Sequence, residues 1–209
     1  MFMFWILLVY LIITYFIPEV GVIAIICMIG PVAMSVKKGR YWCGHFCPRG
    51  SLYDKVISRY SPHKEIPKFV RSKGFRIFML FFIFSMFGIQ LAQHGFTLAG
   101  IGRVFWNIIL ATTIVGIVLG FIYAPRTWCS FCPMGTLSSW VAPKTPREGF
   151  PIVYVSSACQ MKCKRCAKAC PMQLTPYTSR GEGNGYLHPD CLKCGNCITA
   201  CPTKVMKMG

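Results

Sequence analysis

A cysteine-rich stretch from Cys159 to Pro202 constrains this chain most strongly, because it holds eight of the thirteen cysteines. Its two halves have the spacings Cys159-x₃-Cys163-x₂-Cys166-x₃-Cys170-Pro171 and Cys191-x₂-Cys194-x₂-Cys197-x₃-Cys201-Pro202. Three closely spaced thiolates on one loop bind three irons of a cubane, and a fourth cysteine before proline binds the other cluster of the pair. The spacing therefore predicts two [4Fe–4S] clusters in this stretch.

The same rule assigns the ligands crosswise between the two halves. One cluster would be held by Cys191, Cys194, Cys197 and Cys170. The other would be held by Cys159, Cys163, Cys166 and Cys201. A disulfide framework or structural zinc would also use many cysteines, but two repeats that each end in Cys-Pro disfavour both.

The stretch resembles the two-cluster (2[4Fe–4S]) ferredoxins. Its second half matches their motif without exception, whereas in the first half Gln160 occupies the expected ligand position and Cys159 comes one residue earlier. A one-residue bulge would still let Cys159 bind, and without it we expect a three-iron cluster at that position.

The chain before residue 125 is apolar enough to enter a membrane. Mean hydropathy over the chain is +0.49, and 14% of the residues are aromatic. Four stretches are predicted to span: Met3–Ile17, Val20–Val36, Phe75–Ala92 and Val104–Ala124. The first has 15 residues, fewer than the roughly 20 a span needs, so a re-entrant hairpin is the alternative for the first pair. Because the first stretch lacks a basic start and a small-residue cleavage site, we expect it to be retained rather than removed as a signal peptide.

The basic residues predict the orientation. Of the 23 Lys and Arg, eleven lie between Lys37 and Arg76, at the start of the third stretch, eleven follow the fourth stretch, and only Arg103 lies between the third and fourth. Loops rich in Lys and Arg stay in the cytoplasm, so we expect a multi-pass protein of the cytoplasmic (inner) membrane with both termini and the cluster domain inside. The formal net charge is +17. The basic residues that produce it lie beside the predicted spans, and the sequence contains no nucleic-acid-binding motif, so we expect membrane contact and no nucleic-acid partner.

A second cysteine pattern repeats within the apolar half. Trp42-Cys43-Gly-His-Phe-Cys47-Pro-Arg-Gly-Ser-Leu and Trp128-Cys129-Ser-Phe-Cys132-Pro-Met-Gly-Thr-Leu each follow a pair of predicted spans, and from Phe46 to Leu52 they match at a constant offset of 85 residues. Two like-oriented helical hairpins related by a pseudo-two-fold axis would bring Cys43, Cys47, Cys129 and Cys132 together at the inner membrane face. Four thiolates suit a third iron–sulfur centre, a single iron or zinc, with a redox-active dithiol or a purely structural role as alternatives. After the first copy, Ser51-x-x-Asp54 predicts a helix-capping box.

The expected fold class is therefore a membrane α-helical protein, with four transmembrane helices as two repeated hairpins, plus a small α+β ferredoxin-like 2[4Fe–4S] domain. We expect the membrane domain at residues 1–140, a linker at 141–156 and the cluster domain at 157–209.

Spans that end in C-x₃-C-P and C-x₂-C-P, followed by a two-cluster domain, resemble the NapH/MauN-type membrane iron–sulfur proteins. That resemblance implies a membrane-anchored electron-transfer subunit that relays electrons between a cytoplasmic donor or acceptor and a centre at the inner membrane face, toward quinone or a partner redox complex. No catalytic residue is assigned. One alternative is a quinol dehydrogenase or quinone reductase in its own right, for which His45 beside the cysteine repeat is the only hint. Another is a redox-sensing or maturation factor.

Overall fold

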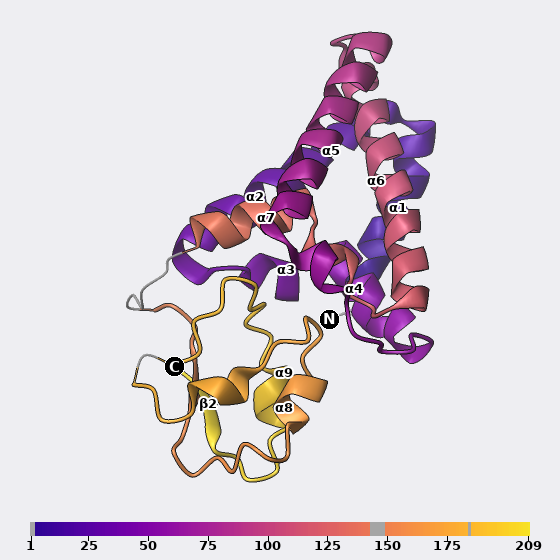
Figure 1. The fold of residues 1–209 in the computed structure, drawn as a ribbon. Helices are drawn as coiled ribbons and strands as arrows, with labels where there is room; N and C mark the ends of the chain where they lie inside the picture. The colour runs from indigo at the N-terminus through magenta and orange to yellow at the C-terminus, as the bar shows by residue number, and fades with distance from the viewer. Residues whose placement is uncertain (1–2, 143–148, 184) are drawn as a thin grey trace.

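The computed structural model describes residues 3–142, 149–183 and 185–209. Apolar helices form one end of the molecule, and a smaller part with a short sheet forms the other end (Figure 1). Short helices that carry the cysteine repeat lie between these two parts (Figure 1). The described chain thus separates a helical body from a cysteine-rich domain, with the repeat at their junction.

Within the described residues, three helices are long and apolar enough to cross a membrane. The 3₁₀ helix η1 (Pro18–Ile23) continues into α2 (Ala24–Lys38), which together make one 21-residue segment, and the others are α5 (Lys73–His94) and α6 (Leu98–Ile122). These three confirm the second, third and fourth predicted spans as apolar helices. The first predicted span is also helical, as α1 (Phe4–Phe16), but its 13 residues are fewer than a straight crossing needs.

Local sequence sets where the long helices begin and end. The hydroxyl of Ser72 accepts a hydrogen bond from Phe75 N at 3.3 Å at the start of α5, and Thr97 does the same for Gly100 N at 3.0 Å at the start of α6. Gly95, at φ 77°, ends α5 in a conformation that favours glycine. These signals make α5 and α6 an antiparallel hairpin with a short turn (Figure 1).

Close backbone contact holds η1 against α6. A Cβ added at Gly102 would collide with the carbonyl of Pro18, and one added at Gly21 would collide with the backbone of Gly102. Small residues allow helices to approach in this way inside a membrane, where burial of apolar surface gives little driving force. The outer face of α5 stays open, with Phe78 60% and Phe81 67% exposed, as expected for side chains that meet lipid.

The two cysteine repeats fold alike. The first forms α3 (Tyr41–His45) and α4 (Pro48–Lys55), and the second forms η4 (Trp128–Ser130) and α7 (Pro133–Val141). In both copies proline opens the second helix, where its missing N–H costs nothing. The predicted capping box at Ser51 is therefore wrong, because α4 already begins at Pro48 and the Asp54 carboxylate binds Arg126. The helix α4 packs on α1 of its own hairpin and on α6 of the other hairpin. In the same way, α7 packs on α5 of its own hairpin and on α2 of the other, as expected if a pseudo-two-fold axis relates the two hairpins. The short 3₁₀ helices η2 (Ile57–Arg59) and η3 (Lys68–Arg71) lie in the loop that follows α4.

The cysteine-rich domain is built around a two-stranded antiparallel sheet. Its strands β1 (Val153–Val155) and β2 (Met206–Met208) pair with Val153 opposite Met208. The short helices α8 (Arg165–Lys168) and α9 (Asn196–Thr199) each follow a cysteine loop, and η5 (Pro176–Ser179) lies between them in sequence. The strand β1 falls inside the linker expected at 141–156, of which residues 143–148 lie outside the described chain.

Candidate metal centres and their connection

Four cysteines from both motifs of the domain line one pocket. These are Cys170, Cys191, Cys194 and Cys197, the set predicted for one cluster. Gly195, with φ 76°, turns the chain between two of them and starts α9. Apolar side chains complete the wall, among them Met172, Leu174 and Leu192. The structure thus brings this predicted ligand set together around a shared, mainly apolar space.

Three of the four thiols in this pocket are difficult to ionise without a positive partner. Burial raises the pKa of Cys197 to about 12, and the charges of Cys191 and Cys194 add to the effect. Burial likewise raises the pKa values of Cys170 and Cys194. Because an iron core supplies the positive charge that stabilises grouped thiolates, the chemistry of this pocket fits a metal cluster.

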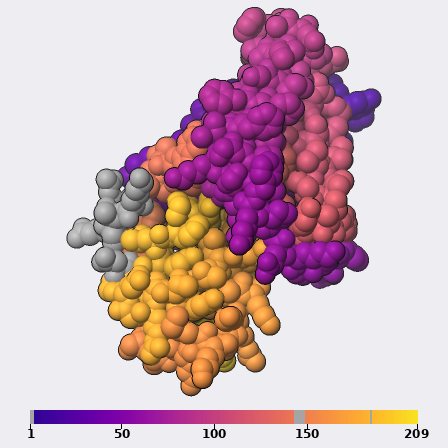
Figure 2. All heavy atoms as spheres, in the orientation of Figure 1, coloured from indigo at the N-terminus to yellow at the C-terminus, as the bar shows by residue number. Residues whose placement is uncertain are grey.

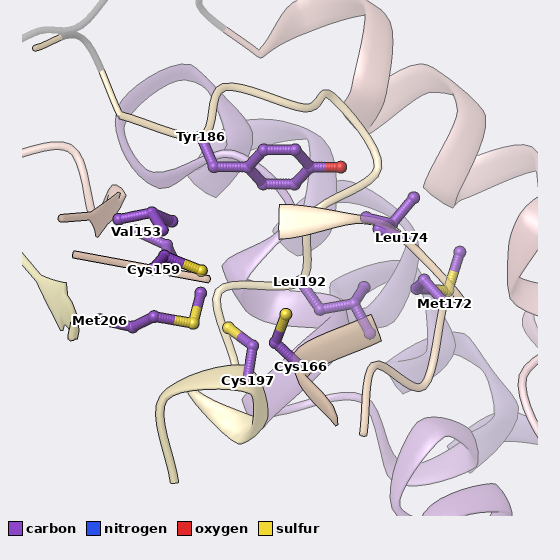
Figure 3. Packing of buried hydrophobic residues seen from close by; sticks show 10 residues of the cluster. Val153, Cys159, Cys166, Met172, Leu174, Tyr186, Leu192, Cys197 and Met206 are labelled. Atoms are coloured by element: carbon purple, nitrogen blue, oxygen red, sulfur yellow. The ribbon is translucent and has the colours of Figure 1, made fainter. Parts of the chain in front are cut away.

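The other predicted set contains Cys159, Cys163, Cys166 and Cys201 at the outer part of the domain. Cys159 and Cys166 are buried in the domain core with Val153 and Met206 (Figure 3), whereas Cys163 is exposed. Burial raises the pKa of Cys166, and the charges of Cys159 and Cys163 raise it further, so these three thiols lie within electrostatic reach of one another. Cys166 also raises the pKa of Cys197, which places the two sets next to each other.

The irregular spacing of the first motif is taken up by a tight turn. Lys162 N donates a hydrogen bond to Gln160 O at 2.6 Å, and Met161 between them adopts a left-handed conformation at φ 55°. This turn absorbs the extra residue while the side chain of Cys159 remains 8% exposed, in the core. The backbone therefore has the bulge that a ligand role for Cys159 requires.

The repeat cysteines also come together. Cys43 lies in α3 and Cys129 in η4, while Cys47 and Cys132 cap α4 and α7. Burial raises the pKa of Cys43, the Arg40 charge opposes this, and the charges of Cys47 and Cys132 raise it again. Burial also raises the pKa of Cys129 to about 12, with Arg126 opposing and Cys47 and Cys132 adding. Cys47 and Cys132 thus lie within electrostatic reach of both Cys43 and Cys129.

Two buried arginines tie the repeats together reciprocally. Arg40 precedes Cys43 by three positions and donates from Nη2 to the carbonyl of Cys129 at 2.8 Å. Arg126 precedes Cys129 by three positions and donates from Nη1 to the carbonyl of Cys43 at 2.8 Å. Each arginine is 1% exposed. Each copy therefore holds the first cysteine of the other copy in place.

Glycine makes room for each guanidinium. A Cβ added at Gly135 would collide with Nη2 of Arg40, and one added at Gly50 would lie 3.1 Å from Nη1 of Arg126. These glycines are equivalent positions of the repeat, so the spaces for the two arginines are equivalent too. The two arginines were not among the predicted site residues, although both copies share the sequence Arg-x-Trp-Cys, which marks them as equivalent.

Asp190 connects the cysteine-rich domain to the repeat. Its Oδ1 lies 2.9 Å from Arg40 Nη1, and its Oδ2 lies 2.7 Å from Arg76 Nη2 at the start of α5. Burial opposes ionisation of Asp190, but the hydrogen bond from Arg76 and the charge of Arg40 hold its pKa below the usual value. A charged triad therefore joins the residue before Cys191 to both the repeat and a long helix.

Further contacts fix the same junction. The side chain of Gln173 accepts from Ile66 N at 2.9 Å and donates to Lys64 O at 2.7 Å. Arg71 donates to Met172 O at 2.7 Å. A Cβ added at Gly44, next to Cys43, would collide with the Leu192 carbonyl, so the backbone between Cys191 and Cys194 lies directly on the first repeat. Cys43 and Cys129 pack against the hydrophobic core that contains the cluster-domain cysteines.

Several buried donors beside the second repeat have no hydrogen-bond partner among the described residues. They are Tyr53 Oη, Trp128 Nε1, Ser130 Oγ, Thr136 Oγ1 and Ser138 Oγ. Leaving such groups unpaired costs free energy, so a site like this fits a further acceptor. Sulfide and thiolate sulfurs of an iron–sulfur centre are acceptors of this kind.

Across residues 3–142, 149–183 and 185–209, no three histidine, cysteine or carboxylate side chains converge closely enough to hold one metal ion. His45, between Cys43 and Cys47, stacks on Tyr41 with ring centroids 3.8 Å apart, and its Nδ1 lies 3.1 Å from Tyr41 O.

Comparison with known families agrees with both cysteine patterns. A family described as a 4Fe-4S binding domain matches residues 20–67 and again 98–147, so each copy covers one cysteine repeat. A family described as a 4Fe-4S dicluster domain matches residues 158–205. The second match confirms the prediction of a 4Fe–4S domain at the C-terminal cysteine motifs.

Known proteins resemble the chain over most of its length. The ferredoxin-type protein NapH of Haemophilus influenzae is 25% identical over 184 residues, which are 83% of this chain and 63% of that protein. Two uncharacterized proteins of Methanocaldococcus jannaschii, MJ0749 and MJ0750, are 27% and 25% identical and cover 85% and 81% of the chain. The chain spans 67% of MJ0749 and 72% of MJ0750. No solved structure matches it.

Proposed function

The chain is an iron–sulfur protein of the NapH type, and from this premise we propose that it is a membrane-anchored electron-transfer subunit. It relays electrons between a cytoplasmic donor or acceptor at the cysteine-rich domain and a centre at the inner membrane face, toward quinone or a partner redox complex. The observation that carries this proposal is the direct contact between the two cysteine sites, through Asp190, Arg40 and the carbonyl of Cys129.

Two [4Fe–4S] clusters are held by the crosswise cysteine sets. The set of Cys170, Cys191, Cys194 and Cys197 lies on the side of the domain that contacts the repeat, and its common pocket supports this assignment. The set of Cys159, Cys163, Cys166 and Cys201 holds the outer cluster, supported by the bulge at Met161. When bound, such clusters supply one-electron oxidation and reduction.

A third iron–sulfur centre is held by Cys43, Cys47, Cys129 and Cys132. The unpaired donors beside these four thiolates favour a cluster over a single iron or zinc, because a cluster adds sulfide sulfurs that can accept their hydrogen bonds. The unpaired hydroxyl and indole donors give hydrogen bonds to its sulfurs, and Arg40 and Arg126 offset the negative charge of four thiolates.

Charge and packing support the membrane arrangement. We propose four helices that form two repeated hairpins, with α1 inserted although it is short, because α4 and α7 pack on equivalent partners. The excess of Lys and Arg at the repeat end of the helices supports a cytoplasmic position for the cysteine-rich domain.

Anaerobic reoxidation of the photochemically reduced protein in vesicles tests this function. We expect slow reoxidation by a soluble quinone analogue alone and fast reoxidation once membranes with native redox complexes are fused. Fast reoxidation by the analogue alone would instead identify a quinone reductase. If no acceptor reoxidises the protein, the relay proposal is wrong.

A further inference from the structure

The cysteine-rich domain has an outer end that faces away from the helical body. In Figure 2 the orange residues that lead into the first cysteine motif lie at this end, whereas part of the yellow segment, which includes the second motif, lies against the helices. Cys163 at the outer end is exposed, while Leu192 and Asp190 contact the repeat. One cysteine site is thus accessible to a soluble partner, and the other is turned to the membrane part.

Exposed basic side chains surround the outer site. We call this set the basic rim; its members are Lys162, Lys164, Arg165, Lys168, Arg180, Lys204 and Lys207. Glu182 is the one exposed acid in the described residues 149–183 and 185–209. None of the ion pairs within the described chain involves a rim residue. The rim therefore carries concentrated positive charge that the protein itself does not neutralise.

The rim is one connected surface. Lys204 N donates to the carbonyl of Cys201 at 3.3 Å, and Lys204 and Lys207 line the same pocket as Ser157. Arg180 donates from Nε to the Ser157 carbonyl at 2.7 Å. Ser157 leads directly into the Cys159 loop, which carries the first rim lysines. The rim residues therefore lie next to both parts of the predicted outer ligand set, the loop of the first motif and Cys201.

Two rim lysines occupy backbone positions that favour glycine. Lys164 and Lys204 have φ of 48° and 51°, in the left-handed region. The position equivalent to Lys164 in the second motif is Gly195, with φ 76°. Glycine adopts this backbone conformation without strain, so both lysines can be replaced by glycine without disturbing their turns.

We propose that the basic rim is the docking surface for an acidic one-electron carrier protein. This inference rests on the proposed function and names the chemistry of the soluble partner. One electron leaves the reduced carrier and is taken up at the outer site, or moves in the reverse sense, and no covalent bond forms or breaks. A lipid surface fits the rim less well, since the first-motif segment, which carries four of the seven rim residues, lies at the end of the domain away from the membrane helices (Figure 2).

The test is binding of an oxidised flavodoxin, an acidic carrier, to the full-length holoprotein in detergent. The variant Lys164→Gly/Lys204→Gly removes two charges at positions whose backbone suits glycine, so its fold is preserved. The control Lys55→Gln/Arg59→Gln removes two exposed charges beside the repeat. Titration calorimetry at low and high ionic strength measures the dissociation constant.

We expect binding at low salt that weakens at least about tenfold at high salt, because screening reduces attraction between exposed charges. The rim variant should weaken binding by about tenfold at low salt, and the control by less than about twofold. Flavodoxin with amidated carboxylates should not bind. Equal binding to the wild type and the rim variant, or undiminished binding of the amidated carrier, would overturn the inference.

The same experiment separates this inference from the proposed function. If a small uncharged photoreductant reduces the clusters of wild type and rim variant equally, the relay stands whatever the flavodoxin result. Binding of the rim to anionic vesicles but not to flavodoxin would reassign the surface to lipid and overturn the carrier proposal.

Discussion

Asp190 accepts a hydrogen bond from Arg40 across 2.9 Å, although 150 positions separate the two residues in the chain. Asp190 directly precedes Cys191, and Arg40 precedes Cys43 by three residues. A second nitrogen of the same guanidinium donates to the Cys129 carbonyl. One buried arginine therefore contacts both the cysteine-rich domain and the cysteine repeat, and it fixes the separation across which electrons would pass.

Removing the carboxylate of Asp190 should loosen the two parts. In Asp190→Asn, Arg40 and Arg76 remain buried without their anionic partner, which typically costs about 3–5 kcal/mol. We expect faster hydrogen exchange at the junction segments around Met172 and Leu192 and faster protease cleavage between the two parts.

The matched control is Asp54→Asn. It breaks the other buried arginine pair, with Arg126, but among the described residues Asp54 forms no hydrogen bond or ion pair with the cysteine-rich domain, and its side chain is 34% exposed. Exchange at the junction should stay near the wild-type rate. Because the pKa of Asp190 is depressed, its contribution is present above about pH 4 and is lost as the pH falls through the lower folded value. Equal loosening by both variants would mean that Asp190 is not the link.

A single methyl group at Gly44 should separate the domain from the repeat. In Gly44→Ala the new Cβ meets the Leu192 carbonyl, which is backbone and cannot rotate away. We expect weaker magnetic coupling between neighbouring reduced centres in the EPR spectrum. Gly88→Ala, in α5, is the control, because nothing lies within 4 Å of its added Cβ. An unchanged spectrum in Gly44→Ala would contradict the observed contact.

Replacing the irregular cysteine should affect one iron. We expect Cys159→Ser to convert the outer cluster to a three-iron form and to lose about one iron per chain, because the other three ligands remain. EPR of the oxidised protein detects the three-iron form. If the iron content and the spectrum do not change, Cys159 is not a ligand and the bulge at Met161 has another role.

The sequence correctly predicted a 4Fe–4S domain at the C-terminal cysteine motifs and three of the apolar helices. Cysteine spacing is a local property, so the second motif could be interpreted without knowing the fold, and the repeat could be recognised from a constant offset. The α2, α5 and α6 helices followed from long apolar runs. The first apolar run gave a shorter helix than expected because Pro18 starts a new segment directly after Ile17.

Contacts between distant segments could not be predicted from local sequence patterns. Arg40, Arg76 and Arg126 were counted only as loop or helix-end charges, whereas the fold buries all three against carboxylates. Asp54 looked like half of a capping box because Ser51 stands three residues earlier, but tertiary pairing with Arg126 decided its position. These relationships depend on how the two repeats face each other, which no local pattern contains.

The most direct test of the account is the iron and acid-labile sulfide content per chain, measured anaerobically on the wild type and on Cys43→Ser/Cys132→Ser. The account predicts about twelve irons in the wild type and about eight in the variant, since each [4Fe–4S] cluster contributes four. EPR after reduction should show the loss of one centre while the two clusters of the cysteine-rich domain remain. About eight irons in both proteins would contradict the third centre and leave the repeat as a scaffold or a dithiol.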